Sequence, residues 1–372
     1  MSLSNEDSLR LNVLLSQDLR AVRIDESAMI LHALTAKGEA KVKLVPNVRD
    51  DVYLRQVREL LSTHALGSPG GYPVFLKRWT RMGQTRETNL DRLLILGEPE
   101  AVVAVAHARG ISEQLARYAW WSMPTADIAR RLLASRDVAQ SPFAKELADF
   151  LLDYMPFETE AQAIIENVRL ILQPNLISDE TRKELWGRAN RKTMYYVGFL
   201  MALPDQLPDE VAQNPRLARE QKRLSELLAQ GNVFARQLTR LLSAPGQLYL
   251  QTLDKAFAKL ANQDMTVSLL GAVENYFACI LTQEYRGIRE PDEIQDRVAQ
   301  RMTNAQEAEL RVLIAALPDS TTQIAAMLSL SMVGEALANP VFSQTDAMGS
   351  VMRKKLEPIV VPIRQHITCL LS

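Results

Sequence analysis

LSELLAQGNVFARQLTRLL, residues 224–242, places large apolar side chains three or four positions apart over several turns. This spacing predicts a helix with one buried face. Pro245 and Gly246 follow and predict its end. Similar patterns predict six more helices, and the spacing of Thr303 and Gln306 fits a capping box for the fourth of them. The six expected ranges are 247–261, 266–283, 292–302, 304–316, 321–338 and 347–356. We therefore expect residues 206–372 to form an all-helical C-terminal domain.

The middle of the chain, 67–205, reads as a series of short helices. Proline signals separate apolar stripes such as the one through Leu147, Phe150 and Leu151. Pro204 and Pro208 lie in an aperiodic stretch that marks the boundary with the C-terminal domain. Helices of this length with short connections resemble a helical-repeat or solenoid-like stack, but no fixed period is present. The sequence predicts an irregular helical array here, preceded by a Gly/Pro-rich basic loop.

The first 66 residues differ from the rest. Ala40, Val42 and Leu44 alternate with Lys41 and Lys43, which predicts a strand with one face in water. Lys37-Gly38 is a plausible tight turn before it, and a β-branched run precedes the turn. Apolar residues after Pro46 recur at helical spacing. We expect a small N-terminal β-hairpin or meander followed by a helix, in a chain that is otherwise mainly α.

Composition restricts the possible functions. The 372 residues contain 43 Lys and Arg against 44 Asp and Glu, a formal charge of −1. This balance excludes a globally basic nucleic-acid binder. Two cysteines fit a reducing compartment, and no secretory signal or bilayer-spanning run is present. We expect a cytoplasmic protein without membrane insertion, in which Cys279 is a buried small hydrophobe.

The sequence contains no recognisable catalytic or metal-binding pattern. The four histidines are scattered, and neither a His-x-x-x-His nor a Cys-x-x-Cys spacing occurs. Ser68 lacks the Gly-x-Ser-x-Gly context of a nucleophile elbow. We therefore expect no metal and no cofactor, and we favour a protein without enzymatic activity.

One segment, 67–86, combines glycines and prolines with basic and aromatic side chains. Guanidinium groups bind phosphate or carboxylate, and aromatic rings can stack bases. The segment is a candidate anion or RNA site, although a loop with its aromatic rings packed on the core is the simpler interpretation. A second basic group surrounds Trp186 at 182–192 and is expected to be a solvated face. The candidate ligand-binding residues are Lys77, Arg78, Trp79, Arg81 and Arg86.

Cys369 lies three residues from the end of the chain, with His366 on the same helical face. A terminal thiol of this kind could carry sulfur as a persulfide. The simpler interpretation is a terminal helix that packs Ile363, Ile367 and Leu370 with the cysteine among them, and we favour it.

Several stretches together resemble one family, the DsrS proteins, which are soluble sulfur-reduction proteins encoded with the dissimilatory sulfite reductase system of sulfur-oxidising bacteria. The stretches are 5–15, 23–27, 67–83, 96–105, 119–126 and 195–200. The resemblance implies a cytoplasmic accessory protein of sulfur oxidation and carries over no activity, cofactor or site.

Three functions follow as hypotheses. The first is a non-catalytic accessory or regulatory protein that acts through protein–protein interaction. The second is an anion- or RNA-binding protein that uses 67–86, and the third is a persulfide carrier that uses Cys369. We favour the first, because abundant short helices and near-neutral charge accompany the lack of catalytic motifs.

Overall fold

The fold is described from a computed structural model, for residues 3–73, 90–304, 307–344 and 348–372. The chain divides into two compact units, Met1–Tyr154 and Met155–Ser372, called unit 1 and unit 2 below. The division lies inside the segment 67–205 that the sequence predicts as one domain, between the predicted boundaries at 66/67 and 205/206.

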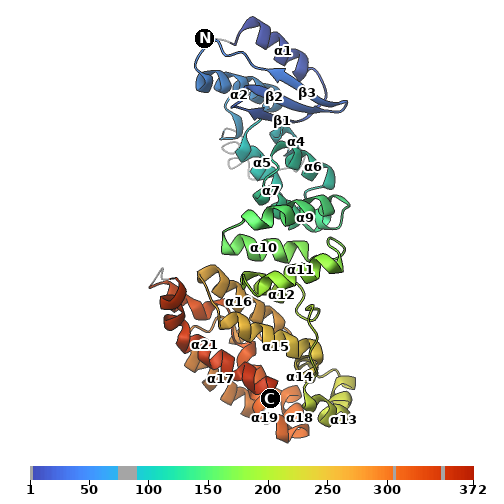
Figure 1. The fold of residues 1–372 in the computed structure, drawn as a ribbon, viewed down its shortest axis with the longest axis vertical. Coiled ribbons are helices and arrows are strands. Elements are labelled where there is room, and N and C mark those ends of the chain that lie inside the picture. Colours follow the sequence, from blue (N-terminus) through green and yellow to red (C-terminus); the bar gives the residue numbers. More distant parts are fainter. Residues whose placement is uncertain (1–2, 74–89, 305–306, 345–347) are drawn as a thin grey trace. The chain divides into compact units, whose positions relative to one another are not determined.

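Unit 1 begins with a three-stranded antiparallel sheet in the order β1-β2-β3 (blue in Figure 1). Its strands are β1 (Leu19–Asp25), β2 (Ile30–Thr35) and β3 (Gly38–Lys43). Gly38 closes the turn between β2 and β3 with φ +118°, a conformation that other residues rarely adopt. This meander confirms the small β element predicted at the N-terminus.

Two helices cover one face of the sheet, α1 (Asn5–Leu15) and α2 (Asp50–Leu66). They bury Leu11 and Val57 against Leu31 and Ala33 of β2 in a single apolar cluster. Burying a leucine side chain of this kind contributes roughly 1.5–3 kcal/mol. The helix predicted after Pro46 is confirmed as α2.

The opposite face of the sheet meets α6 (Glu113–Ser122) through Trp121. The Arg23 guanidinium lies 4.7 Å from the centroid of the Trp121 ring, and the indole N–H donates to Glu39 Oε1 at 2.6 Å. The Val22 N–H donates to the Leu94 carbonyl oxygen at 2.8 Å, so the segment after α4 (Leu90–Leu93) occupies part of the outer edge of β1.

Short helices complete unit 1, and local signals account for their ends. Pro99 occupies the first turn of α5, and the Ser112 and Thr125 side chains cap α6 and α7. The helices are α4 (Leu90–Leu93), α5 (Pro99–Ala106), α6 (Glu113–Ser122), α7 (Ala126–Leu133), α8 (Arg136–Ala139) and α9 (Phe143–Tyr154).

Unit 2 is helical wherever it has regular structure in the described residues, and one apolar cluster from Ile165 to Leu370 forms its core. Its α-helices are α10 (Ala161–Ile171), α11 (Asp179–Ala189), α12 (Met194–Ala202), α13 (Pro215–Ala229), α14 (Val233–Leu242), α15 (Ala244–Phe257), α16 (Gln263–Tyr276), α17 (Pro291–Thr303), α18 (Ala308–Ala316), α19 (Thr321–Ser331), α20 (Asn339–Phe342) and α21 (Gly349–Leu371). Its 3-10 turns are η2 (Met155–Phe157), η3 (Gln283–Tyr285), η4 (Pro318–Ser320) and η5 (Glu335–Ala338).

Several predicted helix ends are wrong. The run 224–242 is two helices, α13 and α14, because Gly231 adopts φ +79° and Asn232 caps the second helix. The helix end predicted before Pro245 is confirmed, because α14 ends at Leu242, but Pro245 itself lies in the first turn of α15, which begins at Ala244 and not at 247. Thr303 ends α17, and its hydroxyl donates back to the carbonyl oxygens of Ala299 and Gln300, so it caps no following helix.

Among the described residues, no single helix is both long and apolar enough to cross a membrane, although the bent pair Ala308–Ala316 and Pro318–Ser331 passes that test of length and composition together.

Candidate protein-interaction groove

A groove of about 590 Å³ lies between α1 and β3 in unit 1. The helix contributes Leu9 and Val13, and the strand contributes residues 40–43. Leu9 is 66% exposed and Val13 is 56% exposed, although both are apolar. The groove therefore combines uncovered apolar side chains with a strand.

The sequence of α1 explains this exposure. Leu11, Leu14 and Leu15 point into the core and are at most 6% exposed. Leu9 and Val13 are four residues apart, so they share a different face of the helix. A helix with one buried face needs one apolar stripe, and α1 has a second.

The outer edge of β3 presents unpaired backbone groups to this groove. The Leu44 N–H donates to the Met29 carbonyl oxygen at 2.8 Å, in line with the pairing of Lys43 with Ile30. In an antiparallel pair, every second residue of a strand forms backbone hydrogen bonds to that neighbour, so the even-numbered residues of β3 bond to β2 through their N–H and C=O groups. The N–H and C=O groups of Glu39, Lys41 and Lys43 therefore point away from the sheet.

The free edge is short. At one end, the Val45 N–H donates to Asp7 Oδ2 of α1 at 3.1 Å. At the other end, β3 begins at Gly38, in the turn that joins it to β2. Between this turn and the Asp7 contact, in residues 39–43, no described group bonds to the outward backbone of β3. About five residues of strand edge remain open.

The two faces of β3 differ in chemistry. Ala40 and Val42 pack partly against the apolar cluster under α1, as the sequence predicts. Lys41 and Lys43 are exposed on the other face, and no described carboxylate lies within ion-pair distance of either. The lining of the groove, as far as the structure describes it, has three basic side chains and no acidic one. Arg10 pairs with Glu6 and Asp7 of its own helix, so Lys41 and Lys43 carry the charge that is open to a partner.

The candidate residues Lys77, Arg78, Trp79, Arg81 and Arg86 lie outside the described residues. In the described part of their loop, two backbone N–H groups already have hydrogen-bond acceptors from outside the loop. The Gly71 N–H donates to Ser62 Oγ at 2.9 Å, and the Tyr72 N–H donates to Glu98 Oε2 at 2.9 Å. A carboxylate therefore occupies the position next to these glycines that a bound anion would need.

A second cavity, of about 730 Å³, adjoins this loop. Carboxylates outnumber cations in its lining, where Arg55 and Arg58 face five Asp and Glu residues. Arg58 also pairs with Glu26. An acidic lining repels phosphate, so the described part of this region gives the anion and RNA hypothesis no support.

The second basic group behaves as a solvated face. Trp186 is 6% exposed and stacks edge to face on Tyr196 and Phe199, so the aromatic residue belongs to the core. Four of its basic side chains are exposed, Lys183, Arg188, Arg191 and Lys192, and the fifth, Arg182, is half-buried and pairs with Asp179. Because 182–192 lies in unit 2 and 67–86 belongs to unit 1, the two basic segments are on different units.

Cys369 lies in the last turn of α21 and packs partly against the core of unit 2. Burial raises the pKa of its thiol, although Arg216 acts in the opposite direction. Burial also lowers the pKa of His366. A half-buried thiol with a raised pKa is a weak nucleophile at neutral pH. The persulfide hypothesis stays a prediction that these surroundings do not favour.

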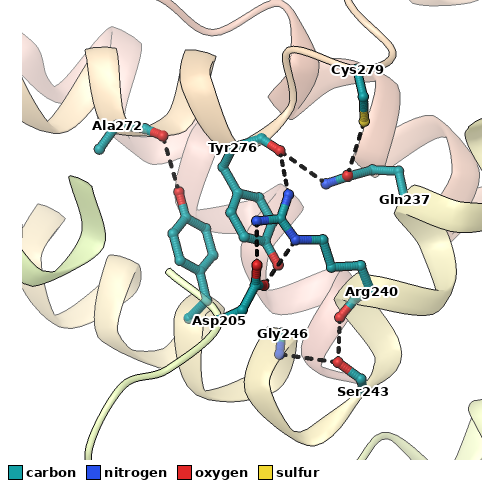
Figure 2. A network of polar contacts seen from close by, with 9 residues as sticks. Asp205, Gln237, Arg240, Ser243, Gly246, Ala272, Tyr276 and Cys279 are labelled. Carbon is teal, nitrogen blue, oxygen red and sulfur yellow. Dashed lines mark hydrogen bonds and ion pairs between the residues drawn. The ribbon is translucent and has the colours of Figure 1, made fainter. Parts of the chain in front are cut away.

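Cys279 is exposed, contrary to the prediction that it is buried. It lies beyond the end of α16, in a region that the sequence predicts as continuous helix. The thiol donates to Gln237 Oε1 at 3.3 Å, and Gln237 Nε2 donates to the Tyr276 carbonyl oxygen at 3.4 Å (Figure 2). Although the residue as a whole is exposed, partial desolvation of its sulfur raises the pKa of Cys279, and the charge of Arg240 acts in the opposite direction.

Arg240 is the centre of this polar network. Its Nε and Nη2 donate to the two Asp205 oxygens at 2.8 Å and 2.7 Å, and its Nη1 donates to the Tyr276 carbonyl oxygen at 2.9 Å. The guanidinium also lies 3.6 Å from the centroid of the Tyr276 ring (Figure 2). The network holds the proline-rich segment after α12 onto α14 and α16. That segment, predicted as a domain boundary, is therefore bound within unit 2.

Cys279 is expected to react with iodoacetamide several-fold faster than Cys369 at pH 8, because only Cys279 is exposed. Both rates should increase above pH 9, since both thiols have raised pKa values and the thiolate is the nucleophile. A time course of peptide mass spectrometry, with Cys279→Ser as the control, measures this. Equal or faster labelling of Cys369 would contradict it and would favour the persulfide hypothesis.

No group of His, Cys, Asp and Glu side chains in the described ranges could hold a metal ion. Sequence reasoning missed Leu9 and Val13, because the apolar run that contains them carried no sign of which side chains face outward. Comparison of the chain with models of protein families, with curated proteins and with solved structures finds no match.

Proposed function

We propose that this protein is a non-catalytic accessory protein that acts by binding another protein, and that the groove between α1 and β3 is its binding surface. One observation carries the proposal: the exposed side chains of Leu9 and Val13 lie beside a strand edge whose outward backbone groups have no partner among the residues that the structure describes. Surface leucine and valine side chains are common singly, but their combination with an open edge is typical of a peptide-binding surface.

The resemblance to the DsrS proteins supplies the context of this proposal. A partner from the sulfur-oxidation machinery of the cytoplasm is the expectation that follows from it. The succession of short helices in both units is consistent with a helical-repeat architecture, which we include in the proposal as the scaffold that carries the groove.

The test compares two variants of the full chain. Leu9→Asp with Val13→Asp places two carboxylates in the groove, and Val312→Asp places one at a site in unit 2 that is 46% exposed. We expect wild type and Val312→Asp to capture the same protein from an extract of the source organism, and the groove variant to lose it. A photo-crosslinking amino acid at position 13, but not at position 312, should link to that protein.

Two outcomes would contradict the proposal in different ways. If all three proteins capture the same set, or if crosslinks form equally from positions 13 and 312, the groove is not the binding surface. If the crosslinked partner has no role in sulfur metabolism, the interaction stands and the metabolic context is wrong.

A further inference from the structure

We infer that the groove takes one extended segment of a partner protein as a fourth strand beside β3, and that this segment alternates apolar and acidic side chains. The inference rests on the proposed function, because it specifies the partner of the same groove. It assigns a mode of binding, β-strand addition, to an edge of known length and chemistry.

The length of the open edge sets the length of the occupant. Residues 39–43 carry the outward backbone groups between the turn at Gly38 and the contact of Val45 with Asp7. At roughly 3.4 Å per residue, five residues span about 17 Å. A segment of about five to seven residues therefore fills the edge.

The alternation follows from the two faces of β3. A residue opposite Lys41 or Lys43 places its side chain on the same face as that lysine, where an acidic group would pair with it. A residue opposite Ala40 or Val42 points to the face covered by α1, next to Leu9 and Val13. An apolar side chain there would cover the exposed part of α1.

Charge argues against a second copy of this chain as the occupant. The lining is basic without an acidic residue in the described ranges. Antiparallel pairing of β3 with β3 of another copy about Lys41 would place Lys41 opposite Lys41, and only Lys43 would have an acidic residue, Glu39, opposite it. Like charges directly opposite each other destabilise a strand pair, so a partner with acidic residues opposite both lysines fits better.

Lysines on an edge strand also protect a protein from aggregation, and this role alone would explain Lys41 and Lys43. It does not explain Leu9 and Val13. A polar surface beside the edge would protect the protein from aggregation, but α1 places two exposed apolar side chains there. Binding accounts for both features.

The test uses the full-length protein and a fluorescent peptide with the core Val-Glu-Val-Glu-Val-Glu-Val between Gly-Ser flanks. We expect its Kd to be at least about tenfold lower than that of the matched Val-Lys peptide, since a tenfold change corresponds to about 1.4 kcal/mol. In the double variant Lys41→Glu with Lys43→Glu, the preference should reverse to the Val-Lys peptide. Both lysines are exposed, so the variant is expected to fold.

Backbone methylation separates strand addition from other kinds of docking. A strand bonds to one neighbour through alternate residues only. Methylating one alternate set of peptide nitrogens should therefore abolish binding, and methylating the other set should change the Kd by less than about twofold. Equal effects of the two sets would overturn the inference.

The inference would also be overturned if the Val-Glu peptide does not bind at 1 mM, or if the two peptides bind equally well. A third contradicting result is a dimer in solution whose stability changes in the double variant Lys41→Glu with Lys43→Glu. These results leave the proposed function intact if position 13 still crosslinks to a partner. Loss of that crosslink contradicts the proposed function independently of the peptide experiment.

Discussion

Replacing Glu307 with alanine is expected to lower the free energy of unfolding of unit 2 by about 3–5 kcal/mol, because it leaves a buried arginine without its counter-ion. Arg301 is 0% exposed, and its Nε and Nη2 each donate to Glu307 at 2.7 Å. The guanidinium also lies 4.6 Å from the Tyr285 ring centroid and 5.6 Å from that of Phe234. Without the carboxylate, the charge would remain between apolar rings.

The matching variant Arg301→Met should be less destabilising than Glu307→Ala, since it removes the buried charge and keeps an apolar chain of similar length. Glu293→Ala is the control, because Glu293 and Arg297 form an ion pair on α17 whose side chains are each 43% exposed. Its effect should be below about 0.5 kcal/mol. Urea unfolding, with hydrogen exchange to locate the change in unit 2, measures all three. A larger loss in Arg301→Met would contradict the argument.

The sequence predicts the helical class and the sheet because local patterns determine both. The alternation from Ala40 to Leu44 places each side chain on the face where the structure has it. Helix ends are harder to predict, because they depend on single backbone conformations such as that of Gly231. Arg301 gives no sign of burial in the sequence, since its partner and both aromatic rings come from separate segments.

The groove is a long-range property, which explains why sequence reasoning did not find it. The pattern in β3 shows which side chains face water, but not that the strand is an edge. That depends on which segment lies beside it. Likewise, Leu9 and Val13 become a surface only because Leu11, Leu14 and Leu15 turn the other face of α1 to the core. A sequence pattern locates a face within one element, and the site requires two elements.

Replacing Asp7 with alanine is expected to lower the free energy of unfolding of unit 1 by about 2–4 kcal/mol, because two buried or partly buried donors lose their acceptor. Asp7 is 1% exposed, and its Oδ2 accepts hydrogen bonds from the Tyr53 hydroxyl and, at 3.1 Å, from the Val45 N–H. Asp7→Asn keeps an oxygen acceptor and should lose less. Glu6→Ala, at a neighbouring side chain that is 71% exposed, is the control and should change the free energy by less than about 0.5 kcal/mol.

The pH dependence of stability gives a second measurement of the same contact. Burial and the Asp7 carboxylate both raise the pKa of Tyr53 well above its usual value of about 10. A raised pKa stabilises the fold while the phenol is protonated, and this contribution is lost as the pH rises above about 10. Asp7→Ala removes the part of the pKa increase that the carboxylate causes, so Tyr53 should ionise at a lower pH and the alkaline loss of stability should be smaller.

Because Asp7 also holds the end of β3 to α1, the variant should weaken Val-Glu peptide binding even where it remains folded. Unchanged stability together with an unchanged tyrosine titration would show that Asp7 does not make this contact in solution.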